Sequence, residues 1–265
     1  MPILPSADED RRGAERSHKL LTFFALVFAL SVPFWLLGAA TGLRILQGLP
    51  VGALMAICPM LAALILVHRE DGRAGAAALL KRAFDVGRIG NKFWLVPAIL
   101  LMPAAMILTL GLTWAMGTPL PVAHVSVLAT LAIFVAFFAA ALGEELGWSA
   151  YAIDPMQDRW GALRASLLLG VVWAVWHIVP LLQAHRPLAW IAWWCLFTLA
   201  LRVLTVWLYN NTGRSTFVAA LFHAMTNLAT LLVPALYDPR LTGPIVAVMA
   251  VVVTVIWGSR TLTRT

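Results

Sequence analysis

Two adjacent carboxylates, Glu144 and Glu145, interrupt an otherwise apolar stretch of the sequence. A charged side chain near the centre of a membrane helix costs about 2.5–3.5 kcal/mol on insertion scales, so a pair of them needs compensation. The apolar helical pattern continues past the pair to Ile153, which indicates that both acids lie inside the membrane. The alternative is that they end the helix at the cytoplasmic surface, where water solvates them. A carboxylate held inside a membrane is a candidate general base.

Two histidines and an amide recur inside other apolar segments. His177 follows Trp173 by four residues, and residues at this spacing share one face of a helix. Asn227 follows His223 at the same spacing. At a rise of about 1.5 Å per residue, Glu144 and His223 lie at similar depths, and the other two are within reach. A single membrane histidine more often packs than catalyses, but this combination predicts one shared site in the cytoplasmic half of the membrane.

The elements that would position these groups follow from the composition. Of the 265 residues, 62% are hydrophobic and 12% are charged, whereas an ordinary soluble domain has roughly 25% charged residues. About 20 apolar residues cross a hydrocarbon core as a helix. The sequence therefore predicts an all-α fold, a polytopic membrane bundle of about eight transmembrane helices, with no room for a large soluble domain.

The predicted spans are separated by glycine, proline and asparagine breaks. They are residues 20–40, 49–67, 93–116, 125–153, 163–182, 188–209, 217–236 and 241–257. Asp154-Pro155 is expected to end the fourth span, because proline disfavours helical geometry in the residue before it.

The chain divides into one membrane domain and two polar tails. Residues 1–19 and 259–265 are the tails, and residues 20–258 are the transmembrane domain, whose catalytic-type core is about 125–235. The basic segment 68–92 suggests a short helix lying on the anionic membrane surface, with a solvated loop as the alternative.

Arginine and lysine placement predicts the orientation. With the N-terminus inside, fifteen of the 19 lie in cytoplasmic segments, Arg202 lies in a span, and three lie on the opposite side: Arg44, Arg186 and Arg240. Both termini are therefore predicted to be cytoplasmic, and a bacterial cytoplasmic membrane is the expected location. Because the basic residues do not form one face with interleaved aromatics, nucleic acid is not an expected partner.

Three motifs occur in order along the second half of the chain. They are Glu144-Glu145-Leu146-Gly147-Trp148-Ser149, Trp173 to His177, and His223 to Asn227. Together they resemble the CPBP intramembrane proteases, which include the CAAX prenyl endopeptidases and the bacteriocin-immunity type. That family is marked by Glu-Glu-x-x-x-Arg, aromatic-x-x-x-His and His-x-x-x-Asn on successive helices. The resemblance implies an intramembrane endopeptidase that acts on a peptide or a lipid-modified protein, in a cavity open to the cytoplasm. Membrane lipid is a further expected partner.

The resemblance also implies roles for the four central residues. Glu144 would be the general base, deprotonating the attacking water together with His177. His223 and Asn227 would stabilise the developing oxyanion. The family is often labelled metallopeptidase, and Glu144, His177 and His223 could supply a three-ligand zinc site. The chain has no His-Glu-x-x-His motif, so zinc-dependent and metal-free catalysis both stay open.

One position departs from the family pattern, because Ser149 stands where the first motif has arginine. Arg202 lies about 10 Å inside the sixth span, at a depth comparable to that of Glu145. We hypothesise that Arg202 neutralises Glu145 from the neighbouring helix. The alternative is that Arg202 extends to the membrane surface. Trp173 is expected either to line the substrate cavity or to pack between helices.

Two other functions fit the same sequence. A catalytically silent scaffold or immunity protein of the same fold would bind a partner, and the loss of the motif arginine favours it. A small proton-coupled transporter would use Glu144, His177 and His223 as a proton relay. Retention of the acid, imidazole and amide groups favours the enzyme, and the sequence shows no internal repeat that would indicate duplicated transporter halves.

Overall fold

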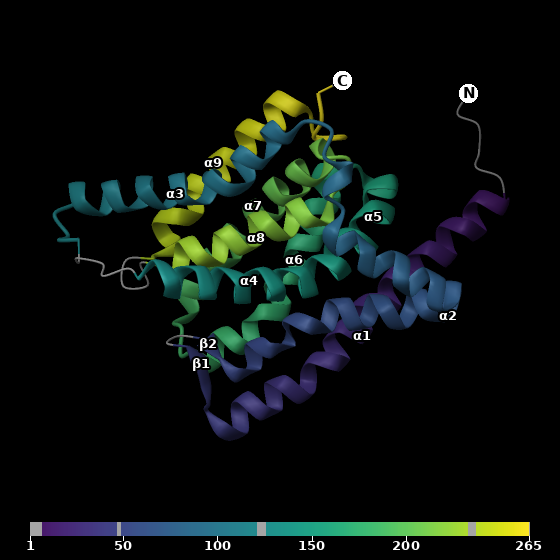
Figure 1. Cartoon of the computed structure of the whole chain (residues 1–265), viewed down its shortest axis with the longest axis horizontal. Coiled ribbons are helices and arrows are strands. Elements are labelled where there is room, and N and C mark those ends of the chain that lie inside the picture. The colour runs from purple at the N-terminus through teal and green to yellow at the C-terminus, as the bar shows by residue number, and fades with distance from the viewer. Residues whose placement is uncertain (1–6, 47–48, 121–125, 233–236, 265) are drawn as a thin grey trace.

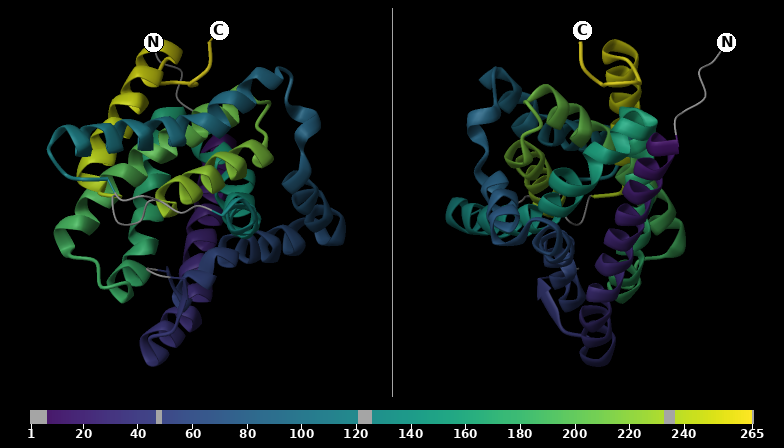
Figure 2. Two further views of the ribbon diagram at one scale, coloured as in Figure 1. Left: turned by 60° about the vertical axis from the view of Figure 1, so that its left-hand side comes forward. Right: turned by 90° about the vertical axis from the view of Figure 1, so that its right-hand side faces the viewer.

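The computed structural model describes residues 7–46, 49–120, 126–232 and 237–264, with side chains from Ser17 onward. Long helices dominate these ranges, and the β-structure within them is one short hairpin, Arg44–Leu46 (β1) and Leu49–Pro50 (β2). The helix α1 begins and α9 ends at one end of the bundle, whereas the hairpin lies at the other end (Figure 1). Figure 2 shows the same arrangement from two further sides.

The helices follow the predicted spans. They are α1 (Ala7–Thr41), α2 (Cys58–Lys81), α3 (Leu95–Ala115), α4 (Val127–Gly147), α5 (Ile153–Trp160), α6 (Ala162–Gln183), α7 (Leu188–Asn211), α8 (Thr216–Leu231) and α9 (Pro239–Trp257). Short 3₁₀ turns precede α2 and join α2 to α3: η1 (Val51–Ile57), η2 (Arg82–Phe84), η3 (Val86–Arg88) and η4 (Lys92–Trp94).

Seven helical segments among the described residues are long and apolar enough to cross a membrane. The predicted seventh span, 217–236, corresponds to the shorter apolar helix α8, and its residues 233–236 lie outside the described ranges. The predicted polytopic helical bundle is therefore confirmed. At the N-terminus, α1 extends as a helix into the predicted tail 1–19.

The largest difference from the sequence prediction lies at the end of the fourth span. A π-helical segment, Trp148–Ala152 (η5), joins α4 directly to α5, so the prediction that Asp154-Pro155 ends the helix was wrong. A π turn widens a helix locally, and this one contains Tyr151, whose carbonyl a proline ring at position 155 would otherwise meet. The helix instead ends before Gly161, whose φ of 75° suits glycine.

This longer helix changes the depth of the acids. Glu144 lies sixteen residues from Trp160, about 24 Å along the helix axis, instead of the roughly 14 Å expected from an end at Ile153. The acids are therefore near the middle of the bundle, farther from the end where the chain starts and finishes.

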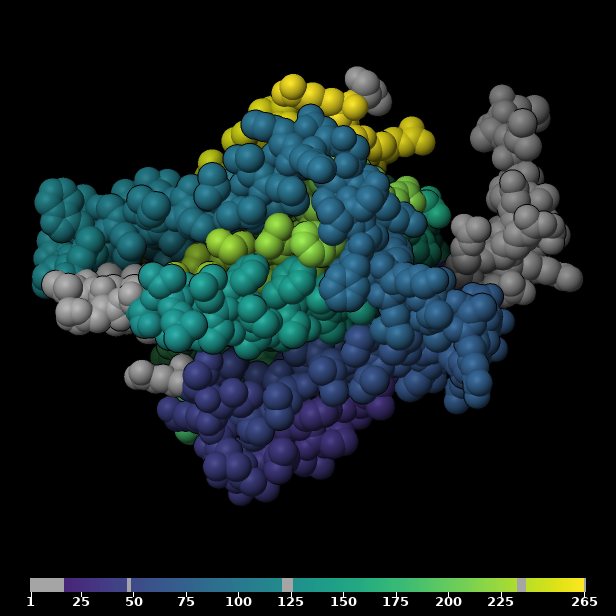
Figure 3. Space-filling model, in the orientation of Figure 1, coloured from purple at the N-terminus to yellow at the C-terminus, as the bar shows by residue number. Residues whose placement is uncertain are grey.

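The basic segment between α2 and α3 is folded. The helix α2 kinks at Gly72, whose φ is 63°, so residues 73–81 form a short helix of their own. The turns after it cover the beginning of α8 (Figure 3). There Asp85 accepts hydrogen bonds from Ser215 Oγ at 2.7 Å and from the backbone N–H of Phe217 at 3.1 Å. That this segment lies on a membrane surface stays a prediction.

Two glycines let the site helices approach their neighbours. A Cβ atom at Gly147 of α4 would lie 2.5 Å from Pro59 of α2. One at Gly170 of α6 would lie 3.2 Å from the Cα atom of Leu199 of α7. Because glycine lacks this atom, α2 can pack directly on α4, and α6 on α7. These contacts position the helices that carry the two acids and Arg202.

We call the end of the bundle where α1 begins and α9 ends the terminal end. The hairpin end is the opposite one, where the β1–β2 hairpin lies and where α3, α6 and α8 end.

Candidate active site

A cavity of about 560 Å³ brings four of the predicted residues together. Glu144 from α4, His177 from α6, and His223 and Asn227 from α8 all line it. The rest of its wall is mainly aliphatic and aromatic. An acid, two imidazoles and an amide from three helices therefore share one concave site.

Glu144 is held by two indole groups. Its Oε2 atom accepts a hydrogen bond from Trp173 Nε1 at 2.7 Å and one from Trp148 Nε1 at 3.3 Å. Within the described ranges, Oε1 has no hydrogen bond partner. The side chain is buried, with 5% of its surface exposed. One carboxylate oxygen is thus fixed, and the other is available to the cavity.

Glu145 lies in a different environment, fully buried and surrounded by polar partners. Its Oε2 atom accepts hydrogen bonds from Arg202 Nη1 at 2.9 Å and from Ser149 Oγ. Its Oε1 atom lies 3.1 Å from His223 Nδ1. The structure therefore contains the ion pair that we hypothesised, and Arg202, which is also fully buried, does not extend to the membrane surface. Neither member of the pair lines the cavity.

The indole of Trp173 connects the two acid environments. Arg202 Cζ lies 4.3 Å from its ring centroid, a cation–π contact. The imidazole centroids of His223 and His177 lie 5.1 and 5.4 Å from the same ring. Trp173 packs between helices and also lines the cavity. That this cavity takes substrate stays a prediction.

The contacts of the histidines assign their ring nitrogens. His177 Nδ1 lies 2.8 Å from the backbone oxygen of Trp173, and His223 Nδ1 contacts the carboxylate of Glu145. Because a carbonyl or carboxylate oxygen accepts, Nδ1 donates in both rings. Nε2 of each ring is then the nitrogen left for chemistry in the cavity.

The side chains do not form the zinc site considered from the sequence. Among the residues with described side chains, no three His, Cys, Asp or Glu groups gather as metal ligands would, so Glu144, His177 and His223 are not such a cluster. Hydrogen bonding does not decide this, because each imidazole uses only Nδ1 for a protein contact and Glu144 uses only Oε2. The three side chains as placed do not converge as ligands of one zinc ion.

Sequence reasoning missed two of these contacts. The indole of Trp148 follows Glu144 by four residues, so the shared helix face was a usable signal. The pairing of His223 with Glu145 instead of Glu144 had no such signal, because it depends on how α8 rotates against α4.

The cavity extends from the site toward the hairpin end. Its lining includes residues of the β1–β2 hairpin, of the α6–α7 connection and of the segment before α9: Ile45, Leu46, Leu49, Pro50, Ala184, Arg186 and Tyr237. Within the described ranges, no connection at the terminal end contributes to it. Which side of the membrane this end faces, and whether the cavity opens to the cytoplasm, stay predictions.

Comparison with known proteins agrees with the motifs. Residues 126–229 match the family model for type II CAAX prenyl endopeptidase Rce1-like proteins. The predicted family resemblance is confirmed. A CAAX prenyl protease 2 from Methanococcus maripaludis is 27% identical over 259 residues, covering 87% of this chain and 92% of that protein. The matched range contains every predicted site residue, from Glu144 to Asn227.

Proposed function

We propose that this chain is an intramembrane endopeptidase in which Glu144 activates a water molecule. The proposal rests on the different surroundings of the two carboxylate oxygens of Glu144. Oε2 accepts hydrogen bonds from two indoles, whereas Oε1 is left for the apolar cavity that Glu144 and His177 both line. The likeness to CAAX prenyl endopeptidases supports peptide hydrolysis as the reaction class.

The reaction follows from these positions. A water molecule beside Oε1 gives a proton to Glu144, with Nε2 of His177 accepting a hydrogen bond from the same water. The resulting hydroxide attacks the carbonyl carbon of the scissile peptide, and the carbonyl oxygen becomes an oxyanion. Glu144 then passes its proton to the leaving amine as the carbon–nitrogen bond breaks. One water is consumed, and a carboxyl and an amino terminus are formed.

The oxyanion is stabilised from α8. The amide of Asn227 donates from one turn beyond His223, and both side chains line the cavity. An imidazolium at His223 has donors on both ring nitrogens, one for Glu145 and one for the oxyanion. Donors fixed in a dry cavity act more strongly on developing charge than they do in water.

Glu145, Ser149 and Arg202 act as positioning residues. Glu145 fixes the ring of His223, as carboxylates commonly orient a functional histidine. Arg202 and Ser149 satisfy the other carboxylate oxygen. Arg202 thus supplies from α7 the charge that the family motif supplies from position 149. The absence of arginine at position 149 therefore does not favour a silent scaffold.

The substrate is a peptide or a lipid-modified protein with an apolar segment near the scissile bond. A wall rich in aromatic and aliphatic side chains favours such a segment. The similarity to a CAAX prenyl protease 2 supports prenylated proteins as one such class.

The proposal is tested in cells that carry the native chain, Glu144→Gln or Glu70→Gln. Glu70 is a partly exposed acid on α2, paired with Lys19 at 3.0 Å, and its variant is the matched control. Mass spectrometry of membrane proteins should find cleavage products with the native chain and Glu70→Gln that are absent with Glu144→Gln. If a cellular phenotype persists while Glu144→Gln leaves every product unchanged, the chain is a scaffold and the proposal is wrong.

A further inference from the structure

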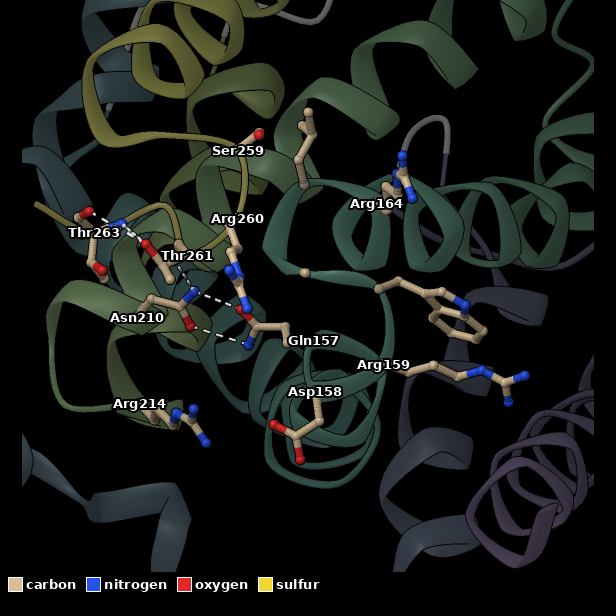
Figure 4. A pocket seen from close by; sticks show the side chains of 13 residues that line it. Gln157, Asp158, Arg159, Arg164, Asn210, Arg214, Ser259, Arg260, Thr261 and Thr263 are labelled. Carbon is tan, nitrogen blue, oxygen red and sulfur yellow. Dashed lines mark hydrogen bonds between the residues drawn. The ribbon is translucent and has the colours of Figure 1, made fainter. Parts of the chain in front are cut away.

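We infer that a second pocket, at the terminal end of the bundle, binds the phosphate headgroup of an anionic phospholipid. This site goes beyond the proposed function and does not rest on it, since no described residue lines both this pocket and the candidate active site. The pocket has a volume of about 820 Å³, and α5, α6, α7 and the chain after α9 all contribute to its wall (Figure 4). Among the described residues, one acid, Asp158, and four arginines line it: Arg159, Arg164, Arg214 and Arg260.

The chain after α9 folds back over the start of α6 and so forms one side of the pocket. The backbone oxygen of Arg260 accepts a hydrogen bond from the backbone N–H of Ala162 at 2.8 Å. Gly161 permits this approach, because its φ is 75° and a Cβ atom there would lie 3.3 Å from the same oxygen. Arg260 is thereby placed beside the first turn of α6, which carries Arg164.

Side-chain amides fix another part of the wall. Asn210 Nδ2 donates to Gln157 Oε1 at 2.6 Å and to Thr261 O at 2.8 Å (Figure 4). The neighbouring Asn211 donates to Leu262 O at 2.7 Å. These bonds join α5, α7 and the chain after α9, so the pocket is formed without a ligand. A ligand that enters it does not have to order the wall.

Two of the four arginines already have partners. Arg214 Nη1 lies 3.5 Å from Asp154 Oδ2, and Arg159 donates to a serine hydroxyl of α1. Arg164 and Arg260 are exposed, and within the described ranges their side chains make no ion pair or hydrogen bond. Two like charges on the wall of one pocket repel each other, and an anion bound between them removes this repulsion.

Phosphate is the anion that suits two guanidinium groups. The planar guanidinium group donates two parallel hydrogen bonds to phosphate oxygens, which makes arginine the usual residue for phosphate recognition. Hydroxyl groups that can donate further hydrogen bonds line the same pocket, on Ser259, Thr261 and Thr263. Basic pockets between membrane helices are typical sites for phospholipid headgroups.

The position of the pocket favours a lipid over a free phosphate ion. Arg164 lies in the first turn of a helix that is long and apolar enough to cross a membrane, so it is expected at the depth of the headgroups. Beyond it, the same face of α6 is exposed and apolar, at Leu167, Leu168, Val171 and Val175. Acyl chains can lie along this face while the headgroup occupies the pocket.

The test uses the full chain purified in a neutral detergent and measures its unfolding temperature as dioleoyl phosphatidylglycerol is added. Dioleoyl phosphatidylcholine, which has the same acyl chains and no net charge, is the lipid control. One double variant, Arg164→Gln with Arg260→Gln, removes the two arginines without partners. The matched control is Arg69→Gln with Arg73→Gln, because both arginines are exposed on α2, make no ion pair within the described ranges and line neither cavity.

Phosphatidylglycerol should raise the unfolding temperature of the native chain and of the α2 control, since a ligand that binds only the folded chain stabilises it. Phosphatidylcholine should have little effect. In the Arg164→Gln, Arg260→Gln variant, the lipid concentration that gives half of the shift should rise about tenfold or more, because charge-assisted hydrogen bonds are lost. An equal response of the two double variants, or an equal shift with phosphatidylcholine, would overturn the site.

A second arm replaces the lipid with glycerophosphoglycerol, the same headgroup without acyl chains, at matched ionic strength. No shift is expected at the concentrations at which the lipid acts, because burial of the acyl chains supplies part of the binding. A shift with this soluble headgroup that Arg164→Gln with Arg260→Gln abolishes would overturn the lipid as the ligand. Neither arm measures cleavage, so the outcome is independent of whether the chain is an endopeptidase.

Discussion

Glu144 and Glu145 are neighbours in the sequence and occupy opposite kinds of environment. Glu144 has indole donors on one oxygen and the cavity beside the other. Glu145 has every oxygen occupied by a positively charged or polar group, namely Arg202, Ser149 and His223. The first carboxylate is open on one side, and the second is fully enclosed.

Helix geometry explains the division. Successive residues of an α-helix point about 100° apart, so one of two adjacent acids faces the cavity and the other faces α7 and α8. Two adjacent acids in a membrane helix therefore need not both be catalytic. One can carry the reaction while the other holds a histidine and an arginine in place.

Removing the partner of the enclosed acid should have the largest effect on stability. Arg202→Ala leaves Glu145 buried without its ion-pair partner, which typically costs about 3–5 kcal/mol. Unfolding of the purified chain in detergent should show this loss. Adding Ser149→Arg should restore much of it, because Ser149 Oγ and the guanidinium of Arg202 both contact Glu145 Oε2.

Arg186→Ala in the cavity lining is the control for the loss of an arginine and should leave stability nearly unchanged. Equal free energies of unfolding for the Arg202→Ala and Arg186→Ala variants would show that the buried pair does not stabilise the fold.

The indole that donates to Glu144 should matter for activity more than for folding. Trp173→Phe keeps an aromatic ring but removes a hydrogen bond to a carboxylate, worth about 1.5–3 kcal/mol, or roughly ten- to a hundredfold in rate. Trp148→Phe removes the longer bond and should have the smaller effect. Initial rates of Glu144-dependent product formation compare the two. A larger loss with Trp148→Phe would contradict the assignment of Trp173 as the main donor.

A substitution that pushes α4 away from α2 should displace Glu144 and Glu145 together and lower stability. A methyl group at Gly147 would collide with Pro59, and overpacking of this kind costs about 1–3 kcal/mol. Gly111→Ala on α3 is the control, since nothing lies within 4 Å of its added atom. The temperature of thermal unfolding should be lower in Gly147→Ala and not in Gly111→Ala. If neither variant changes the unfolding temperature, α2 does not constrain α4 at this point.

A capping residue far from both acids should have the smallest effect. Asp238 accepts from the backbone N–H of Arg240 at 2.9 Å at the start of α9, and Asp238→Ala should cost about 1 kcal/mol. Burial alone raises the pKa of Asp238. The hydrogen bonds and charge of Arg240 together lower it by more, so the pKa of Asp238 lies below its usual value.

A lowered native pKa means that this contribution is present above the unfolded pKa and is lost as the pH falls through the native pKa. The stability difference between the native chain and Asp238→Ala should therefore shrink on acidification. A difference that grows on acidification would contradict the cap.

Much of the fold and part of the site follow from the sequence. Hydropathy locates the helices, and four-residue spacing places His177 and Trp173 on one face, as well as His223 and Asn227. The depth of Arg202 was enough to predict its partner. These features depend on local periods and on rise per residue, which a sequence determines directly.

The remaining features depend on packing between helices. Local rules cannot decide whether the helix ends at Asp154-Pro155 or continues through a π segment to Gly161. It continues, and Glu144 therefore lies deeper in the bundle. The choice of Glu145 as the partner of His223 depends on helix rotation. The extent of the cavity depends on which helices and connections line it together, and this too is a matter of packing.

The most direct test of Glu144 as the general base compares Glu144→Gln with Glu145→Gln in the purified chain, using a peptide that is cleaved in cells carrying the native chain and not in cells without it. Each variant is measured for its single-turnover cleavage rate and its unfolding temperature. We predict that Glu144→Gln lowers the rate by about 10²–10⁴-fold at an almost unchanged unfolding temperature. Glu145→Gln should lower the unfolding temperature clearly. A Glu144→Gln variant that cleaves at the native rate would contradict the role of Glu144 in activating water.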